Sequence, residues 1–102
     1  REIIAASILD GEFTDGDLLP SVRAFAAAQG ANPLTVAKAY QSFQDDGLVV
    51  VKRGVGMFVA AGATRRLREA ERERFLETIW PPVAAQMRRL GLRIEDMDLA
   101  QV

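Results

Sequence analysis

The chain has 102 residues, a formal net charge of −1, and ordinary shares of hydrophobic (49%) and charged (26%) side chains. These values predict one globular domain, or one small domain with an appendage. It contains neither cysteine nor histidine, which excludes disulfides, thiolate metal sites and the usual catalytic base. No apolar run has the length of a membrane span and the start does not resemble a signal peptide, so we expect a cytoplasmic protein without membrane contact.

The charge differs little between the two parts of the chain. Residues 1–62 have a net charge of −2, and residues 63–102 a net charge of +1. The net charge therefore argues neither for nor against nucleic acid. A local cluster of positive side chains is sufficient for a DNA-binding face, so the placement of the lysines and arginines decides more.

The first part of the chain predicts three short helices. Residues 1–9 form the first, which begins so abruptly that we expect its first turns to be missing. Ser21 is the expected N-cap of the second helix, and Gly30 ends it.

The third predicted helix begins at Asn32, a good N-cap, and Pro33, which is favoured at the first helical position. It extends to about Asp46. Its buried stripe is expected to comprise residues spaced at helical intervals, namely Val36, Ala39, Tyr40 and Phe43.

A β-hairpin is predicted over residues 48–60, with β-branched residues in its first strand and a glycine-rich turn at residues 53–56. The order helix, helix, short turn, helix, hairpin is the plan of a winged helix-turn-helix. In that arrangement the second helix of the pair lies in the DNA major groove, and the hairpin, or wing, reaches the minor groove or backbone. Four positive side chains fall on these elements: Arg23, Lys38, Lys52 and Arg53.

Three motifs in this order resemble the GntR family of bacterial transcriptional regulators. They are LPSVRAFA at residues 19–26, NPLTVAKAY at 32–40, and DGLV at 46–49 with RGVGMFV at 53–59. The residues of the second motif and the short C-terminal region resemble those of the YtrA-type subfamily. The resemblance implies an α+β, mostly helical protein with an N-terminal winged helix-turn-helix (residues 1–62) and a short C-terminal helical dimerisation region (residues 63–102). It also implies a homodimer on a palindromic double-stranded DNA operator, usually acting as a repressor, and we expect no cofactor and no metal.

The resemblance also implies which residues contact DNA. Arg23 is expected at a phosphate or a base, Thr35 at a phosphate, and Arg53 with Gly54 at the tip of the wing. The full set of expected contacts is Ser21, Arg23, Asn32, Pro33, Leu34, Thr35, Lys38, Lys52, Arg53 and Gly54. The chain departs from the family at Pro33 and Ala37, where many members have arginine, at Leu34, where a polar residue is usual, and at Met57, where threonine is usual.

Several of these residues have an alternative interpretation. Asn32 is expected mainly to cap its helix, with a DNA contact in addition as the alternative. Leu34 is either a tertiary contact or an apolar partner for a thymine methyl group. Lys38 and Arg53 are expected at DNA rather than as free surface charges.

The last forty residues predict a charged helix followed by an apolar one. The charged run at residues 65–74 is expected to be mostly solvated, with Arg65, Arg66 and Arg68 as further candidates for the DNA backbone. Pro81 and Pro82 predict a break or sharp kink near residues 80–82. Residues 94–102 predict one or two further helical turns.

An apolar stripe along this region is too large for two helices to cover, and such patches mark partner surfaces. We therefore expect a two-fold symmetric homodimer. The expected dimerisation residues are Leu67, Phe75, Leu76, Ile79, Trp80, Val83, Met87 and Leu90. The residues neither predict nor exclude a pocket for a small-molecule effector at that interface, and they indicate no particular effector.

Two other classes of function are weighed against DNA binding. A winged helix can instead bind protein, and the few polar groups around Leu34 and Ala37 favour that alternative. A carboxylate enzyme would use Asp15 with Asp17, or Asp45 with Asp46, but adjacent acids at turns and helix ends are usually solvated. We therefore expect the chain not to be an enzyme.

Overall fold

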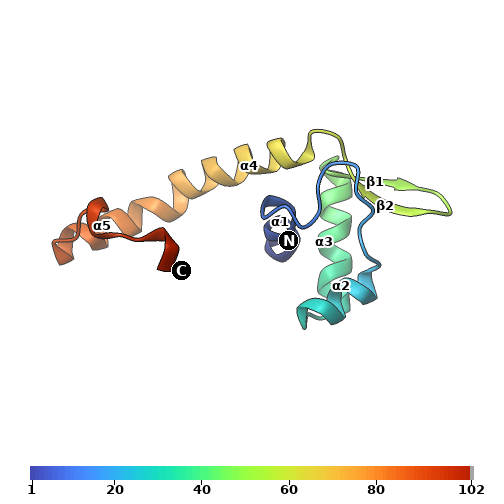
Figure 1. Ribbon diagram of the computed structural model, residues 1–102, viewed down its shortest axis with the longest axis horizontal. Helices are drawn as coiled ribbons and strands as arrows, with labels where there is room; N and C mark the ends of the chain where they lie inside the picture. The colour runs from blue at the N-terminus through green and yellow to red at the C-terminus, as the bar shows by residue number, and fades with distance from the viewer. Residues whose placement is uncertain (102) are drawn as a thin grey trace. The chain divides into compact units, whose positions relative to one another are not determined.

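The structure is a computed structural model that describes residues 1–101 (Figure 1). It contains two compact units, Arg1–Glu69 and the residues from Ala70 onward. The elements of the first unit are α1 (Glu2–Leu9), α2 (Val22–Gln29), α3 (Pro33–Asp45), β1 (Val49–Lys52), β2 (Gly56–Val59) and the start of α4 (Ala63–Arg74). The second unit continues with a π-helical turn (Phe75–Ile79), α5 (Trp80–Leu90) and two 3₁₀ turns (Ile94–Asp96 and Leu99–Gln101). The predicted fold class, mostly helical with a two-stranded wing, is confirmed.

Local capping sets the turn between α2 and α3, as the sequence predicts. The Ser21 hydroxyl oxygen accepts the N–H of Ala24 at 3.1 Å and so caps α2. Gly30 ends α2 in the left-handed region, with φ +64°, where a residue without Cβ has no steric cost. The short connection brings the start of α3 directly after the end of α2, as in a helix-turn-helix.

The wing is an antiparallel pair in which Val49 lies opposite Val59 and Lys52 opposite Gly56. The segment before α2 lies beside β2 and pairs with it through a single antiparallel bridge between Leu18 and Phe58. On that side the N–H of Leu19 donates to the carbonyl of Met57 at 2.8 Å. Strand β2 is therefore bonded on both edges, and the wing is fixed to the chain that leads into α2.

The core of the first unit draws side chains from each of its helices and from both strands. Its largest fully buried side chains are Ile4, Ile8, Phe25, Phe43, Val49, Val59 and Leu67. Tyr40 is also buried, as predicted, and its ring packs edge-on against Phe25 with the centroids 5.9 Å apart. The stripe along α3 that periodicity predicts is thus the face that fixes this helix to the rest of the unit.

The placement of Leu67 in the dimerisation set is wrong. Its side chain is only 2% exposed, and it belongs to the core cluster of the first unit. Residues Ala63 and Leu67 lie one turn apart on α4, and both are buried against that core. The first turns of α4 therefore complete the N-terminal unit, so Leu67 is not available to a partner.

Of the break or sharp kink predicted near residues 80–82, the break does not occur, because the helix continues through a π-helical turn just before the proline pair. Residues 75–79 form this turn, and the N–H of Trp80 donates to the carbonyl of Phe75, five residues earlier. Pro81 and Pro82 follow in the first turn of α5, where prolines need no N–H partner. The Thr78 hydroxyl donates to the carbonyl of Arg74 at 2.6 Å. The backbone thus stays helical through Ile79 and Trp80.

The C-terminal end of α5 agrees with the sequence. Gly91 ends the helix in the left-handed region at φ +68°. The two 3₁₀ turns that follow match the one or two turns predicted for residues 94–102, except that residue 102 lies outside the described residues.

Candidate nucleic-acid interface

The first turn of α3 exposes the side chains on which a DNA contact would depend. Asn32 caps the helix through its Oδ1 atom, which accepts the N–H of Leu34 at 2.8 Å. Leu34, Thr35 and Lys38 are exposed and Ala37 is half-buried. We call these four residues the recognition face. Leu34 is 64% exposed, which argues against the tertiary contact that was one of its two interpretations.

Two further elements supply the remaining predicted contacts. Arg23 lies in the first turn of α2 and is exposed, directly after the Ser21 cap. On the wing, Arg53 and Gly54 form the turn between the strands, with Gly54 at φ +78°. Lys52 precedes them, and its Nζ lies 4.6 Å from the centre of the Phe58 ring.

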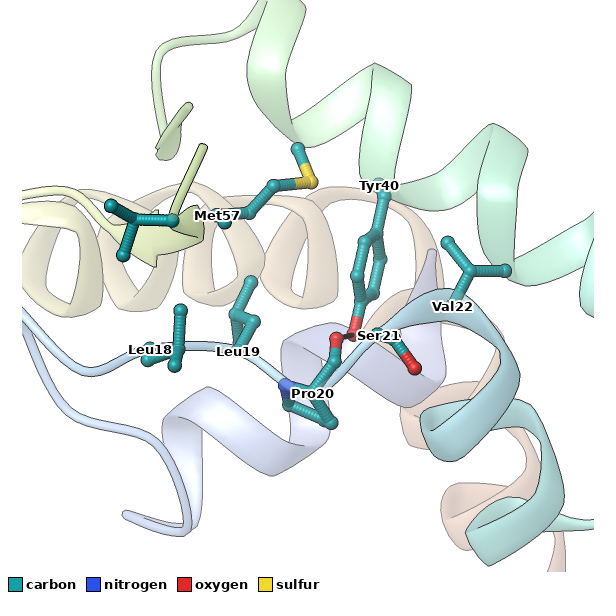
Figure 2. A pocket seen from close by; sticks show the side chains of 9 residues that line it. Leu18, Leu19, Pro20, Ser21, Val22, Tyr40 and Met57 are labelled. Atoms are coloured by element: carbon teal, nitrogen blue, oxygen red, sulfur yellow. Dashed lines mark hydrogen bonds between the residues drawn. The ribbon is translucent and has the colours of Figure 1, made fainter. Parts of the chain in front are cut away.

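The start of α2 and the wing border one pocket of about 370 Å³ (Figure 2). Ser21 and Val22 line it from α2, and Val55 and Gly56 line it from the wing. Tyr40 lines it from α3, and the Tyr40 hydroxyl donates to the Pro20 carbonyl at 2.8 Å. All three elements with predicted DNA contacts, the start of α2, α3 and the wing, therefore border the same pocket.

Three of the positive side chains on these elements have no partner within the described residues, whereas Arg1 and Arg66 of the same unit are bonded. Within residues 1–101, none of Arg23, Lys38 and Arg53 forms an ion pair or a side-chain hydrogen bond. Their charges are therefore exposed to solvent and available to an anion such as a phosphate.

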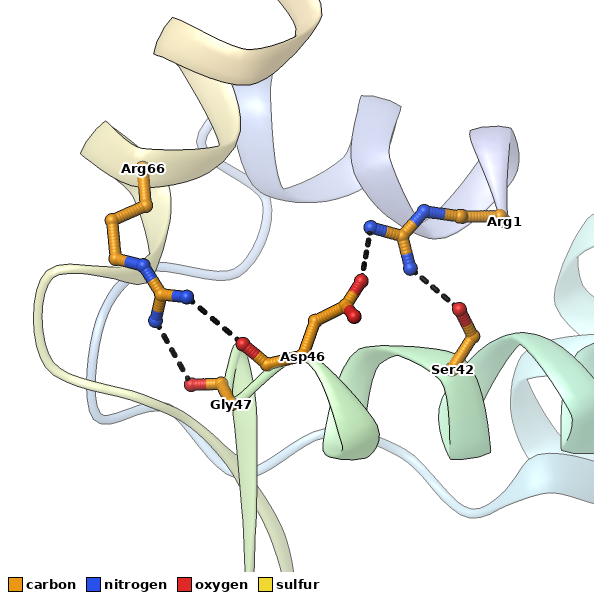
Figure 3. Close-up of polar contacts among 5 residues, drawn as sticks. All are labelled: Arg1, Ser42, Asp46, Gly47 and Arg66. Atoms are coloured by element: carbon orange, nitrogen blue, oxygen red, sulfur yellow. Dashed lines mark hydrogen bonds and ion pairs between the residues drawn. The ribbon is translucent and has the colours of Figure 1, made fainter.

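Arg1 and Arg66, by contrast, are both used at the end of α3 (Figure 3). Arg1 forms an ion pair with Asp46 at 2.7 Å and donates to the Ser42 hydroxyl at 2.6 Å. Arg66 donates to the carbonyl oxygens of Asp46 at 2.9 Å and Gly47 at 3.3 Å. Because these carbonyls belong to the negative end of the helix, a guanidinium stabilises them.

The expectation that Arg66 contacts DNA is therefore not supported, because its guanidinium is already bonded to the backbone. Arg65 forms an ion pair with Glu69 at 3.2 Å, although both side chains remain exposed. Of the three arginines considered at the start of α4, Arg68 has no partner among the described residues.

The acidic residues considered for catalysis have structural partners. The Asp15 carboxylate accepts the N–H of Gly62 at 2.7 Å and both the N–H and hydroxyl of Thr64, at 3.1 and 2.7 Å. These bonds, the hydroxyl of Thr64 foremost, lower the pKa of Asp15. Asp17 accepts the N–H of Thr14 at 2.8 Å, and Asp45 accepts the amide of Gln41 at 2.9 Å.

The comparisons with known proteins agree with this geometry. Residues 1–59 match the family model "Bacterial regulatory proteins, gntR family". The chain belongs to the GntR family. It is 33% identical over 86 residues to the uncharacterized HTH-type transcriptional regulator YhcF of Bacillus subtilis, covering 84% of this chain and 69% of YhcF. It is 40% identical over 63 residues to the HTH-type transcriptional repressor YtrA of the same organism, covering 62% of this chain and 48% of YtrA.

Solved structures extend the similarity. A GntR family transcriptional regulator from Listeria monocytogenes superposes with a TM-score of 0.70 at 25% identity, covering 93% of this chain and 82% of that one. YtrA from Sulfolobus acidocaldarius gives a TM-score of 0.52 at 35% identity, covering 76% and 81% of the two chains. These relatives make this chain a GntR regulator of the YtrA type with a DNA-binding winged helix, rather than an enzyme.

Most residues expected at the dimer surface of this GntR regulator are exposed within the second unit. Phe75, Leu76, Ile79, Val83 and Leu90 are between 39% and 65% exposed. Met87, in contrast, is only 8% exposed. The prediction that Met87 lies at the dimer surface is therefore wrong, because the side chain is buried within its own unit.

Sequence reasoning missed further apolar residues of the second unit. Leu92, Ile94, Met97 and Leu99 are all exposed, and they follow Gly91, where the helical stripe ends. Their signal was the mere presence of aliphatic residues in a short tail. The apolar surface of the GntR regulator is therefore larger than the helical periodicity indicated.

In the part of the chain that the structure describes, no helix is long and apolar enough to cross a membrane. Across those same residues, no group of three or more acidic residues is placed to hold a metal ion.

Proposed function

We propose that this GntR regulator is a sequence-specific DNA-binding repressor that acts as a homodimer on a palindromic operator. The observation that supports this most strongly is the set of unpartnered cations Arg23, Lys38 and Arg53 on the start of α2, on α3 and on the wing. Each of these elements is one that a winged helix-turn-helix presents to DNA. A regulator of this kind acts where the chromosome lies, so the proposal includes a cytoplasmic location.

In the proposed complex the residues have different roles. The recognition face enters the major groove, with Leu34 and Ala37 toward the bases, while Thr35, Lys38 and Arg23 bind phosphates or base edges. The free N–H groups at the start of α2, next to Ser21, favour a phosphate at the same place. Lys52, Arg53 and Gly54 of the wing contact the neighbouring backbone or minor groove. Asn32 and Pro33 fix the start of α3.

The homodimer and the direction of regulation have separate support. The exposed apolar residues of the second unit form a surface that a two-fold partner would bury twice. A symmetric dimer presents two identical DNA-binding domains to two half-sites, so its operator is expected to be palindromic. The repressor role rests on the similarity to YtrA, a transcriptional repressor by name.

The deciding experiment is an unbiased selection of DNA sequences, followed by affinity measurements at several salt concentrations. We expect one palindromic sequence to be enriched, and its affinity to fall steeply with salt as counterions are released. Arg23→Ala should lower the affinity by about 1–3 kcal/mol if Arg23 contacts a base, or mainly reduce the salt slope by about 1 if it contacts a phosphate.

Arg72→Ala is the matched control, because Arg72 is an exposed arginine that lies outside the first unit. It should leave both affinity and salt slope unchanged. If Arg23→Ala behaves like this control, the contact assigned to Arg23 does not exist.

The alternative is a winged helix that binds a protein partner, favoured by the apolar recognition face around Leu34 and Ala37. That alternative predicts no enriched DNA sequence and no gel shift with any duplex. The salt titration therefore separates the two functions directly.

A further inference from the structure

The recognition face has an unusual chemical character at its leading edge. Leu34 occupies the second position of α3 and is 64% exposed. Aliphatic side chains this exposed are common singly on surfaces, but this one lies where a winged helix meets base edges.

The residues around Leu34 offer few hydrogen bonds to bases. Pro33 has no N–H, and Ala37 has no polar side-chain atom. The Oδ1 atom of Asn32 already accepts the N–H of Leu34 at 2.8 Å. Thr35, the Asn32 amide NH₂ and, one turn further along α3, Lys38 remain as side-chain donors, so the first turn around Leu34 itself is largely apolar.

The DNA major groove contains few groups that suit such a surface. Its base edges present hydrogen-bond donors and acceptors, and the one apolar group in unmodified DNA is the C5-methyl of thymine. An aliphatic side chain placed against a polar base edge would remove water from that edge without replacing the lost hydrogen bonds. A methyl group, by contrast, gains by burial against Leu34.

The geometry points to Leu34 as a specificity-determining residue that binds a pyrimidine C5-methyl group in each operator half-site. The assignment rests on the proposed DNA-binding function. Thymine is the source in unmodified DNA, and 5-methylcytosine carries the same group at the same place in the groove.

The test substitutes single bases in the operator obtained by selection. Each thymine is replaced in turn by deoxyuridine, which removes only the methyl group, and each cytosine by 5-methylcytosine, which adds one. Affinities are measured for the full chain and for the variants Leu34→Ala and Val55→Ala. Val55 is a matched control, because it is an aliphatic side chain 65% exposed on the wing rather than on α3.

We expect one thymine per half-site whose replacement weakens binding of the wild-type chain about fourfold, the value of one buried methyl group. Leu34→Ala should bind the two forms equally, while Val55→Ala should retain the fourfold difference. The other source would be 5-methylcytosine. It is identified if one 5-methylcytosine raises the affinity about fourfold, only when Leu34 is present, and no deoxyuridine lowers the affinity. Leu34→Ala should fold normally, since the position is exposed and alanine favours helix.

The inference is overturned if neither substitution changes affinity, or if Leu34→Ala retains the methyl dependence. A selected operator without methyl dependence removes this assignment and leaves the proposed function in place. A selection that enriches no sequence removes both.

Discussion

Tyr40 shows how one residue connects the recognition helix to the rest of the unit. Its hydroxyl donates to the Pro20 carbonyl at 2.8 Å, and burial raises its pKa to about 12. Because the neutral form is favoured in the folded state, the contribution of Tyr40 to stability is fully present below pH 10. It is lost as the pH rises through about 12.

This shift can be measured directly, since Tyr40 is the single tyrosine of the chain. We expect the phenolate absorbance of the folded protein to appear with a midpoint near pH 12, and near pH 10 in denaturant. A folded-state midpoint near pH 10 would contradict the burial of the phenol.

Replacing the same side chain tests the hydrogen bond itself. Tyr40→Phe should lower the free energy of unfolding by about 1 kcal/mol at neutral pH, because the Pro20 carbonyl loses its donor. Chemical denaturation measures the difference. Gln44→Ala, at an exposed position of α3, should leave the unfolding midpoint nearly unchanged. An equal effect of the two variants would show that the hydrogen bond adds nothing.

At the scale of elements, Asp15 fixes the start of α4 from a loop far away in the sequence. Its carboxylate binds the N–H groups of Gly62 and Thr64 as an N-cap would, although it lies 47 and 49 residues before them. The tie anchors the first turn of the helix that covers the core through Ala63 and Leu67.

Asp15→Ala should therefore destabilise the protein at neutral pH. The hydrogen bonds lower the pKa of Asp15 below its usual 3.8, so its contribution is present above that pH and lost as the pH falls through the folded-state value. Thermal unfolding of wild type and variant should thus differ at pH 7 and converge in acid. Asp10→Ala, which removes an exposed carboxylate without a partner among the described residues, is the control. A difference that persists unchanged in acid would rule out the carboxylate as its source.

On the scale of the whole molecule, the exposed apolar surface of the second unit is expected to join two chains. Replacing Ile79 and Trp80 together by Asp should give monomers in sedimentation, because two charges would be buried in the interface. A monomer has one DNA-binding domain instead of two linked ones, so operator binding should weaken by on the order of a hundredfold.

Arg89→Glu is the control for that variant, since it changes the net charge by the same amount at an exposed polar position of α5. It should remain dimeric. A double variant that stays dimeric and binds the operator normally would place the interface elsewhere.

Local signals account for what the sequence predicted well. Ser21, Gly30 and Asn32 act on backbone groups within four residues, so their roles follow from residue type alone. The exposure of Arg23 and Lys38 follows from helical periodicity in the same way. The family motifs then supplied the function.

What the sequence did not predict depends on contacts between distant residues. The residues predicted for the dimer surface begin at Leu67 and resume at Phe75 after a charged run. Nothing in their spacing indicates that Leu67 packs into one unit and Phe75 lies on the surface of another. The pairing of Asp15 with Thr64 is likewise invisible to local patterns. The two prolines predicted a break or sharp kink near residues 80–82, and no local pattern indicated the π-helical turn that precedes them.

The bonds of Arg66 have a consequence for how this protein tolerates sequence change. The guanidinium donates only to main-chain oxygens, the carbonyls of Asp46 and Gly47, so these two bonds do not depend on the side chain at position 46. Gly47 is constrained only by its own φ of +73°. Mutational scanning should therefore find position 66 more restrictive than position 46, where a substitution loses only the exposed ion pair with Arg1. The joint between α3 and α4 depends on the arginine alone.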